Sequence, residues 1–212
     1  MFQVKKLLVL APHTDDAELG SGGLIARLIE EGMDVYVVSF SAAEQSIPED
    51  VPKDTLRKEF RNSMSILGVQ EQNMHVFHYK VRTFSDHRQE ILDDLITLRN
   101  EINPDLVCLP CSHDVHQDHQ VIHNEGKRAF KNSSVLGYEL PWNQTNFSSE
   151  VFVGLDKRHI DQKWNALKAY RSQIAMNRPY FTDDFIYGLA RLRGTQIKKE
   201  WAEAYEVVRV IV

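Results

Sequence analysis

Cysteine is scarce in this sequence, with only Cys108 and Cys111 among 212 residues. Their C-x-x-C spacing occurs in redox motifs and in half of a structural zinc site, but a four-thiolate site needs two further thiols that the chain lacks. Cys108 falls in the strand-like run 106–110, so we interpret it as a small buried hydrophobe. Nothing in this cysteine content calls for an oxidising compartment, and we expect a cytoplasmic protein.

Long apolar runs and an excess of positive charge are also missing. No segment approaches the roughly 20 apolar residues of a membrane-spanning helix, so we expect no stable membrane insertion. Lys and Arg number 25 against 30 Asp and Glu, a formal net charge of -5, and such a chain repels the phosphates of a nucleic acid partner. A hydrophobic share of 42% is ordinary for a globular protein and excludes a disordered or fibrous one.

Strand-like and helix-like stretches alternate along the chain. We predict strands at 6–11, 35–40, 74–79, 106–110, 135–140, 150–155 and 205–212, helices at 24–31, 53–67, 86–102, 120–130 and 156–174, and a polar loop at 41–52. Alternation with near-continuous apolar strands predicts an α/β fold whose mostly parallel sheet is flanked by helices. Because no repeat, low-complexity tract or linker divides the chain, we predict one domain over residues 1–212.

Polar loops follow two of these strands, and both are rich in residues that bind metals. The first loop holds His13, Asp15 and Asp16, and the second holds four histidines and two aspartates within residues 113–123. Active sites of open parallel sheets lie outside the carboxyl ends of the strands, where both loops are predicted to be. Imidazole nitrogens and carboxylate oxygens are zinc ligands, and a catalytic zinc usually keeps three of them and one open position.

The ligand set follows only in part from spacing. His13 and Asp16 are placed to reach one ion, and the third ligand would come from the second loop. There the residues leave the choice open between four histidines, which are His113, His116, His119 and His123. A histidine followed by two aspartates is also the composition of a helix cap, and a histidine cluster can be merely solvated. Clustering at two strand ends makes a metal site the favoured interpretation.

Glycines follow the first loop at positions 20, 22 and 23. Their spacing matches neither a dinucleotide-binding motif nor a phosphate-binding P-loop. We therefore predict that they allow the first helix to pack closely on the sheet.

Five motifs, in chain order, resemble the LmbE-like, or PIG-L-type, family of zinc N-deacetylases. They are residues 11–20 (A-P-H-T-D-D-A-E-L-G) with Gly22 and Gly23, Arg57-Lys58-Glu59, His116-Gln117-Asp118-His119, the K-x-x-A-L-x-x-Y-x-S-Q pattern over 163–173, and Arg193-Gly194 with 202–207. The first and third motifs are specific as a pair, and the others support them. Thr14 replaces the usual proline and Ala17 stands where glutamate is frequent, which bears on substrate preference more than on catalysis.

The resemblance implies a Rossmann-like single domain with one divalent zinc ion, bound by His13, Asp16 and His119. It also implies that Asp15 is the general base. His116 would then assist at the carbonyl oxygen or the leaving group, and Asp118 would orient His116 and raise its pKa.

The reaction implied by the resemblance removes the N-acetyl group from an N-acetylated amino sugar or its glycoconjugate and releases acetate and a free amine. Arg57 is a predicted substrate contact, and Trp142 is the predicted platform on which a sugar ring stacks. Two alternatives stay open, a metal-dependent esterase or phosphoesterase and a non-catalytic sugar-binding module. The sequence does not name the sugar and leaves a homo-oligomer open.

Overall fold

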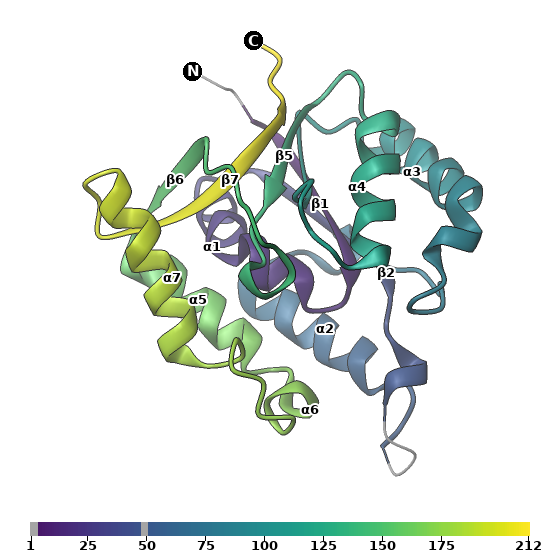
Figure 1. Ribbon diagram of the computed structural model, residues 1–212, viewed down its shortest axis with the longest axis horizontal. Coiled ribbons are helices and arrows are strands. Elements are labelled where there is room, and N and C mark those ends of the chain that lie inside the picture. Colours follow the sequence, from purple (N-terminus) through teal and green to yellow (C-terminus); the bar gives the residue numbers. More distant parts are fainter. Residues whose placement is uncertain (1–3, 48–50) are drawn as a thin grey trace.

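The computed structural model of the protein describes residues 4–47 and 51–212, and its centre is a seven-stranded sheet (Figure 1). The strands are β1 (Lys6–His13), β2 (Asp34–Ser41), β3 (Met74–Val76), β4 (Leu106–Pro110), β5 (Ser134–Tyr138), β6 (Val151–Leu155) and β7 (Trp201–Arg209). In the order β3-β2-β1-β4-β5-β7-β6, the first five strands pair in parallel and β7 runs antiparallel to both of its neighbours. The predicted α/β fold with a mostly parallel sheet is confirmed.

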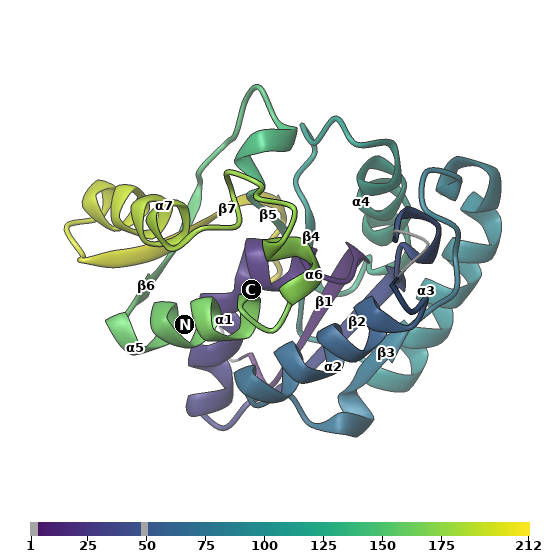
Figure 2. The same cartoon turned by 90° about the horizontal axis from the view of Figure 1, so that it is seen from below.

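Helices cover both faces of the sheet. They are α1 (Asp16–Glu30), α2 (Thr55–Leu67), α3 (Arg88–Ile102), α4 (Gln117–Ala129), α5 (Lys157–Leu167), α6 (Arg171–Ile174) and α7 (Asp183–Gln196), with 3-10 turns at Glu44–Ser46, Glu71–Asn73, Phe84–His87 and Pro141–Asn143. Two views show α3 and α4 on one side and α1, α5 and α7 on the other (Figures 1 and 2). Across residues 4–47 and 51–212, no helix combines the length and the apolar character that a bilayer span requires.

The core is divided by the alternation of side chains along the strands. In β1, Leu7 and Val9 contribute to the cluster under α1, α2 and α5, whereas Leu8 and Leu10 contribute to the cluster under α3 and α4. All four are fully buried. A strand that buries both faces is continuously apolar, which is why the sequence signal for β1 is clear.

The connections place the carboxyl ends of β1 and β4 at the point where the strand order reverses. From β1 the chain builds outward through β2 to β3, and it then crosses back to form β4 on the other side of β1. Such a switch point is where open α/β sheets bind ligands. The two loops that hold the candidate metal ligands both start here.

Several predicted boundaries are wrong. The helix expected over 156–174 is two helices, because α5 ends at Leu167 and α6 begins at Arg171. The final strand is β7, which ends at Arg209, and β3 ends at Val76. Helix α7 was not predicted at all. The loop expected at 41–52 contains the turn Glu44–Ser46, and its residues 48–50 lie outside the described residues.

Candidate active site

The first loop continues into helix α1, which is broken at Ser21, where the φ of -141° is not helical. Both sides of the break are stabilised by one buried ion pair. The Lys163 ammonium donates to the Leu19 carbonyl oxygen (2.8 Å), while the Glu203 carboxylate accepts the N–H groups of Gly23 (2.9 Å) and Leu24 (2.8 Å). Lys163 and Glu203 themselves lie 2.8 Å apart. The pair therefore fixes the first turn of α1, which holds the site, relative to the rest of the helix.

The glycines at this break allow close packing, as predicted. A Cβ added to Gly23 would come within 2.5 Å of Leu155, and one added to Gly20 within 2.4 Å of Tyr138. Both neighbours belong to strands of the sheet. No larger residue fits there without moving α1 away from the sheet.

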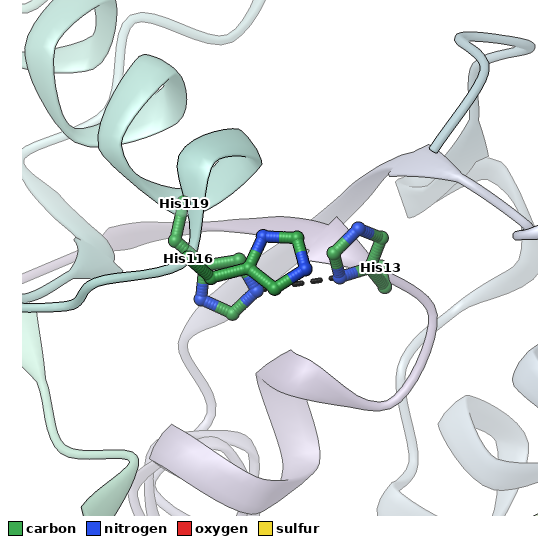
Figure 3. Close-up of side chains that lie close together, drawn as sticks. All are labelled: His13, His116 and His119. Atoms are coloured by element: carbon green, nitrogen blue, oxygen red, sulfur yellow. Dashed lines mark hydrogen bonds between the residues drawn. The ribbon is translucent and has the colours of Figure 1, made fainter. Parts of the chain in front are cut away.

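Three side-chain atoms converge between the two loops. His13 Nδ1 and His119 Nε2 each lie 3.3 Å from Asp16 Oδ2, and the two ring nitrogens are also 3.3 Å apart. Two ligands at the usual zinc distance in a tetrahedral site are separated by roughly 3.3 Å. Figure 3 shows the rings of His13, at the end of β1, and His119, near the start of α4, facing each other. This donor set fits a tetrahedral zinc ion with one position open for water.

Each of these two imidazoles is backed by a carboxylate. His119 Nδ1 lies 2.8 Å from Asp114 Oδ2, and His13 Nε2 lies 3.1 Å from Asp118 Oδ2. Histidines that bind metals usually donate their other N–H to such a group, which fixes the tautomer and directs the free nitrogen to the ion. Asp114 was missed as a site residue by the sequence reasoning, although it stands in the same loop. The Asp118 carboxylate contacts His13, and Asp118 reaches His116 through its backbone N–H.

His116 lies beside these three atoms, and it is one of three histidines with nitrogens that all lie within 4.8 Å of one another. Its side chain caps α4, since His116 Nδ1 accepts the N–H of Asp118 at 3.2 Å. A neutral ring that accepts at Nδ1 carries its proton on Nε2. Two sets of side chains could thus hold a metal, the three histidines within 4.8 Å and the triangle of His13, Asp16 and His119 with sides of 3.3 Å. The triangle is tighter and better matches a zinc ligand set.

The site is built to hold positive charge. Burial lowers the pKa of His119, but the Asp16 charge and the Asp114 hydrogen bond outweigh it and raise that pKa to about 10. Burial raises the pKa of Asp16, but the charges of His119 and His13 hold it well below its usual range. These shifts favour protonated imidazoles beside ionised carboxylates, and a divalent cation at this place would displace the imidazole protons.

Asp15 has a different environment from its neighbour Asp16. It lines the cavity and forms no side-chain cap at α1, which removes the alternative that this carboxylate serves as a helix cap. Burial and the adjacent Asp16 carboxylate raise the pKa of Asp15 to about 6. Such a group is ionised at neutral pH yet accepts a proton readily, as a general base must.

The pKa of His116 is lowered to about 4, first by burial and then by the neighbouring His119 and His13 charges. Asp118 acts in the opposite direction but is outweighed. Asp118 thus raises the pKa of His116 as expected, but burial and the two neighbouring imidazoles make the net shift downward. A neutral His116 is a hydrogen-bond donor through Nε2, not a store of a transferable proton.

A cavity of about 490 Å³ opens over these groups and is lined by Asp15, His116 and Trp142 among others. The Trp142 ring stacks on Tyr180 with centroids 3.9 Å apart and planes 9° from parallel. The two rings form an aromatic wall, and one face of the Trp142 indole is covered by its partner. Trp142 is thus at the cavity, as a sugar contact requires.

Arg57 is not brought to this cavity. Its guanidinium lies 2.8 Å from Glu44 Oε1 and donates to the carbonyl oxygens of Val76 (3.0 Å) and Phe77 (2.8 Å). These contacts hold the end of β3 against α2, so we leave Arg57 out of the proposed site.

A buried hydrogen-bond network holds the first loop from behind. The Tyr170 hydroxyl contacts the Thr14 carbonyl oxygen and lies 2.8 Å from Glu18 Oε1, which Ser63 also contacts. Burial raises the pKa of Glu18 to about 8. Thr14 separates His13 from Asp15, so this network fixes the backbone between them. Tyr170 lies in the break between α5 and α6, and from there its hydroxyl reaches the Thr14 backbone.

Comparison with known proteins gives a consistent result. The model of the PIG-L family, GlcNAc-PI de-N-acetylase, matches residues 8–130. An Escherichia coli protein described as the uncharacterised deacetylase YaiS is 28% identical over 179 residues, which cover 79% of this chain and 91% of that protein. Diacetylchitobiose deacetylase of Thermococcus kodakarensis is 28% identical over 166 residues, covering 74% of this chain and 58% of the relative.

Among solved structures, N,N'-diacetylchitobiose deacetylase of Pyrococcus horikoshii superposes with a TM-score of 0.78 at 22% identity, covering 97% of this chain and 84% of that one. This likeness shows the shared fold. The family match includes both histidine-containing loops and more than half of the sequence. The chain belongs to the PIG-L family of GlcNAc-PI de-N-acetylases.

Proposed function

We propose that this protein is a zinc-dependent N-deacetylase, formed by one domain over residues 1–212, that hydrolyses the acetamide of an N-acetylated amino sugar or its glycoconjugate. The products are acetate and a free amine. The carrying observation is the triangle of His13, Asp16 and His119 atoms, 3.3 Å on each side, beside the cavity-lining Asp15. Membership of a de-N-acetylase family supports the reaction and the class of substrate.

His13, Asp16 and His119 would hold the ion, with Asp118 and Asp114 orienting the two imidazoles. When bound, zinc lowers the pKa of a coordinated water to about 7 and polarises a carbonyl oxygen. An amide needs both effects, because it is a poor electrophile and water is a poor nucleophile at neutral pH.

Asp15 takes a proton from the water that attacks the acetyl carbon. The new C–O bond makes the carbon tetrahedral, and the former carbonyl oxygen gains negative charge. His116 donates its Nε2–H to that oxygen as the charge develops. Asp15 then returns its proton to the amide nitrogen, the C–N bond breaks, and the amine leaves. In this sequence Asp15 performs both proton transfers, and His116 acts as a hydrogen-bond donor.

The aromatic wall offers the apolar face of a sugar ring a matching surface. Trp142 and Tyr180 both line the cavity, and an aromatic side chain binds a ring by broad apolar contact. The cavity has the volume of ordinary small-molecule sites.

The test combines metal analysis with acetate release. Purified enzyme is stripped with a chelator, reloaded with one equivalent of zinc, and assayed on N-acetylglucosamine, its methyl glycoside and N,N'-diacetylchitobiose. We expect activity only after reloading, and we expect Asp15→Asn to retain zinc while losing at least about a hundredfold in kcat. Turnover of phosphate or acyl esters by the zinc form, with no acetate from any acetamide, would contradict the proposal and favour an esterase.

A further inference from the structure

Two of the motifs found in the sequence contain residues that the proposed reaction does not use, and the structure brings these residues together. Glu59 lies on α2 in one motif, and Ser172 and Gln173 lie on α6 at the end of the other. Helix α6 packs against α2, although Glu59 and Ser172 are 113 positions apart in the chain. Ser172 and Gln173 line the same cavity as Asp15, so α6 forms part of the cavity wall.

Glu59 fixes both the backbone and the side chain of Ser172. Glu59 Oε1 accepts the backbone N–H of Ser172 at 2.9 Å, and Glu59 Oε2 accepts the Ser172 hydroxyl at 2.5 Å. The carboxylate of Glu59 is buried, and such a group is stabilised by hydrogen bonds of this kind. Helix α6 has only four residues and would not be stable alone, so these two bonds help to hold its shape.

The carboxamide of Gln173 is 94% buried as part of a side chain that is only 6% exposed, yet it has almost no partner in the protein. Its Nε2 lies 3.4 Å from Ser172 Oγ, and within residues 4–47 and 51–212 its Oε1 has no hydrogen bond. The side-chain atoms that are sealed from solvent without a partner in the same residues are Glu18 Oε2, Ser21 Oγ and Trp201 Nε1. Gln173 Oε1 is not among these sealed atoms. The carboxamide is therefore open to the cavity that Gln173 lines.

We propose that Gln173 determines substrate specificity by binding a hydroxyl group of the amino sugar through its side-chain carboxamide. This inference rests on the proposed function and adds a specificity-determining residue to its site. A carboxamide offers N–H donors and an acceptor oxygen, and a sugar hydroxyl both donates and accepts. A largely buried polar group without a partner is costly, and a bound sugar would supply the missing partner.

The aromatic wall and Gln173 would then contact different parts of the sugar. Trp142 and Tyr180 offer a surface to the apolar face of the ring, whereas the hydroxyl groups at the edge of the ring need polar partners. The acetamide belongs at the ion beside Asp15, so a hydroxyl group elsewhere on the ring is the group left for Gln173. A contact between Gln173 and the acetamide itself is the alternative that the experiment must separate.

A cycle of variants and substrates tests the contact with the zinc-loaded enzyme, measured by acetate release. The substrates are methyl N-acetylglucosaminide and its 3-deoxy, 4-deoxy and 6-deoxy analogues. Gln173→Met keeps the length of the side chain and removes its donor and its acceptor. We expect this variant to lower kcat/KM about 3- to 10-fold for the parent glycoside, and by less than about twofold for the one analogue that lacks the bound hydroxyl.

The unaltered enzyme gives a second reading that does not depend on the variant. It should turn over that same deoxy analogue with a kcat/KM about 3- to 10-fold below that of the parent glycoside. Gln89→Met is the matched control, because Gln89 is exposed on α3 and does not line the cavity. This control should behave as the unaltered enzyme on all four glycosides.

Equal losses on all four glycosides in Gln173→Met, or no loss on any, would overturn the hydroxyl contact and leave the deacetylase proposal intact. No acetate from any glycoside with the unaltered enzyme would instead overturn the deacetylase. Calorimetry with the same four glycosides then decides the contact separately. Weaker binding of one deoxy analogue, with the difference lost in Gln173→Met, supports the contact, whereas equal affinities or no binding refute it.

Discussion

Asp114 offers a sharp test of the proposed zinc site, because each of its two carboxylate oxygens faces a nitrogen that can donate a hydrogen bond. Oδ2 lies 2.8 Å from His119 Nδ1, and Oδ1 accepts the backbone N–H of His116 at 2.9 Å. An asparagine at this position has the same shape but only one acceptor. If its oxygen faces His116, its NH₂ faces His119 and favours the ring tautomer whose Nε2 carries the proton and cannot bind a metal. If it is flipped, the NH₂ opposes the N–H of His116.

Either arrangement disturbs the support of His119, the proposed ligand, because one changes the tautomer of its ring and the other disrupts the loop that holds Asp114 in place. Loss of a carboxylate behind a metal-binding histidine typically lowers metal affinity about 10- to 100-fold, which corresponds to about 1.4–2.7 kcal/mol. We expect this increase in the zinc Kd for Asp114→Asn, measured by competition with a chromophoric chelator. Asp105→Asn is the control, since Asp105 accepts the N–H groups of Lys5 and Lys6 at the opposite end of β1. An unchanged zinc Kd in a folded Asp114→Asn protein would refute the assigned role of His119.

Three further predictions concern the first loop, the proposed ligand set and the packing of α7. Tyr170→Phe removes the hydroxyl that contacts Thr14 and Glu18, and should lower kcat about tenfold with KM and zinc content unchanged; a change in KM alone would contradict a role in holding the loop. His13→Ala should purify with less than stoichiometric zinc by elemental analysis, and full occupancy would show that the ligand set is wrong. Gly194→Ala should destabilise the protein by about 1–3 kcal/mol in urea unfolding, because its Cβ would meet the backbone of Glu200 and Trp201 at 2.7 Å. Gly188→Ala on the same helix has open space around it and should stabilise by up to about 1 kcal/mol; similar effects at the two glycines would contradict this packing.

The sheet could be predicted from the sequence because the physics of burial acts on each strand separately. A strand such as β1, covered on both faces, must be apolar throughout, and a polar loop after it marks the carboxyl end. The two loops could therefore be assigned to one edge of the sheet before their distance was known. Helix α7 escaped this reasoning because Gly188 and Gly194 weaken its helical signal.

The finer geometry of the site depends on contacts between segments distant in sequence. The amphipathic spacing over 156–174 continues through the break between α5 and α6, so nothing local shows that Tyr170 leaves the helix to reach Thr14. The sequence also does not predict which carboxylate pairs with which imidazole. Asp118 precedes His119 by one residue but contacts His13, while Asp114 reaches across five residues to His119. Which carboxylate contacts which imidazole depends on the side-chain rotamers and on where α4 begins, not on proximity in the sequence.

The different roles of Asp15 and Asp16 follow from where α1 begins. The helix starts at Asp16, whose carboxylate turns back to accept the N–H of His13 at 2.8 Å and thereby faces both imidazoles. Asp15 precedes the first turn, and its side chain is left at the cavity wall. Cationic neighbours lower the pKa of Asp16, whereas burial and Asp16 itself raise that of Asp15 to about 6. In the proposed mechanism, the charge that makes Asp16 a ligand also makes Asp15 a stronger base, so each carboxylate depends on the other. By this reasoning, a neutral residue at 16 weakens proton transfer as well as metal binding.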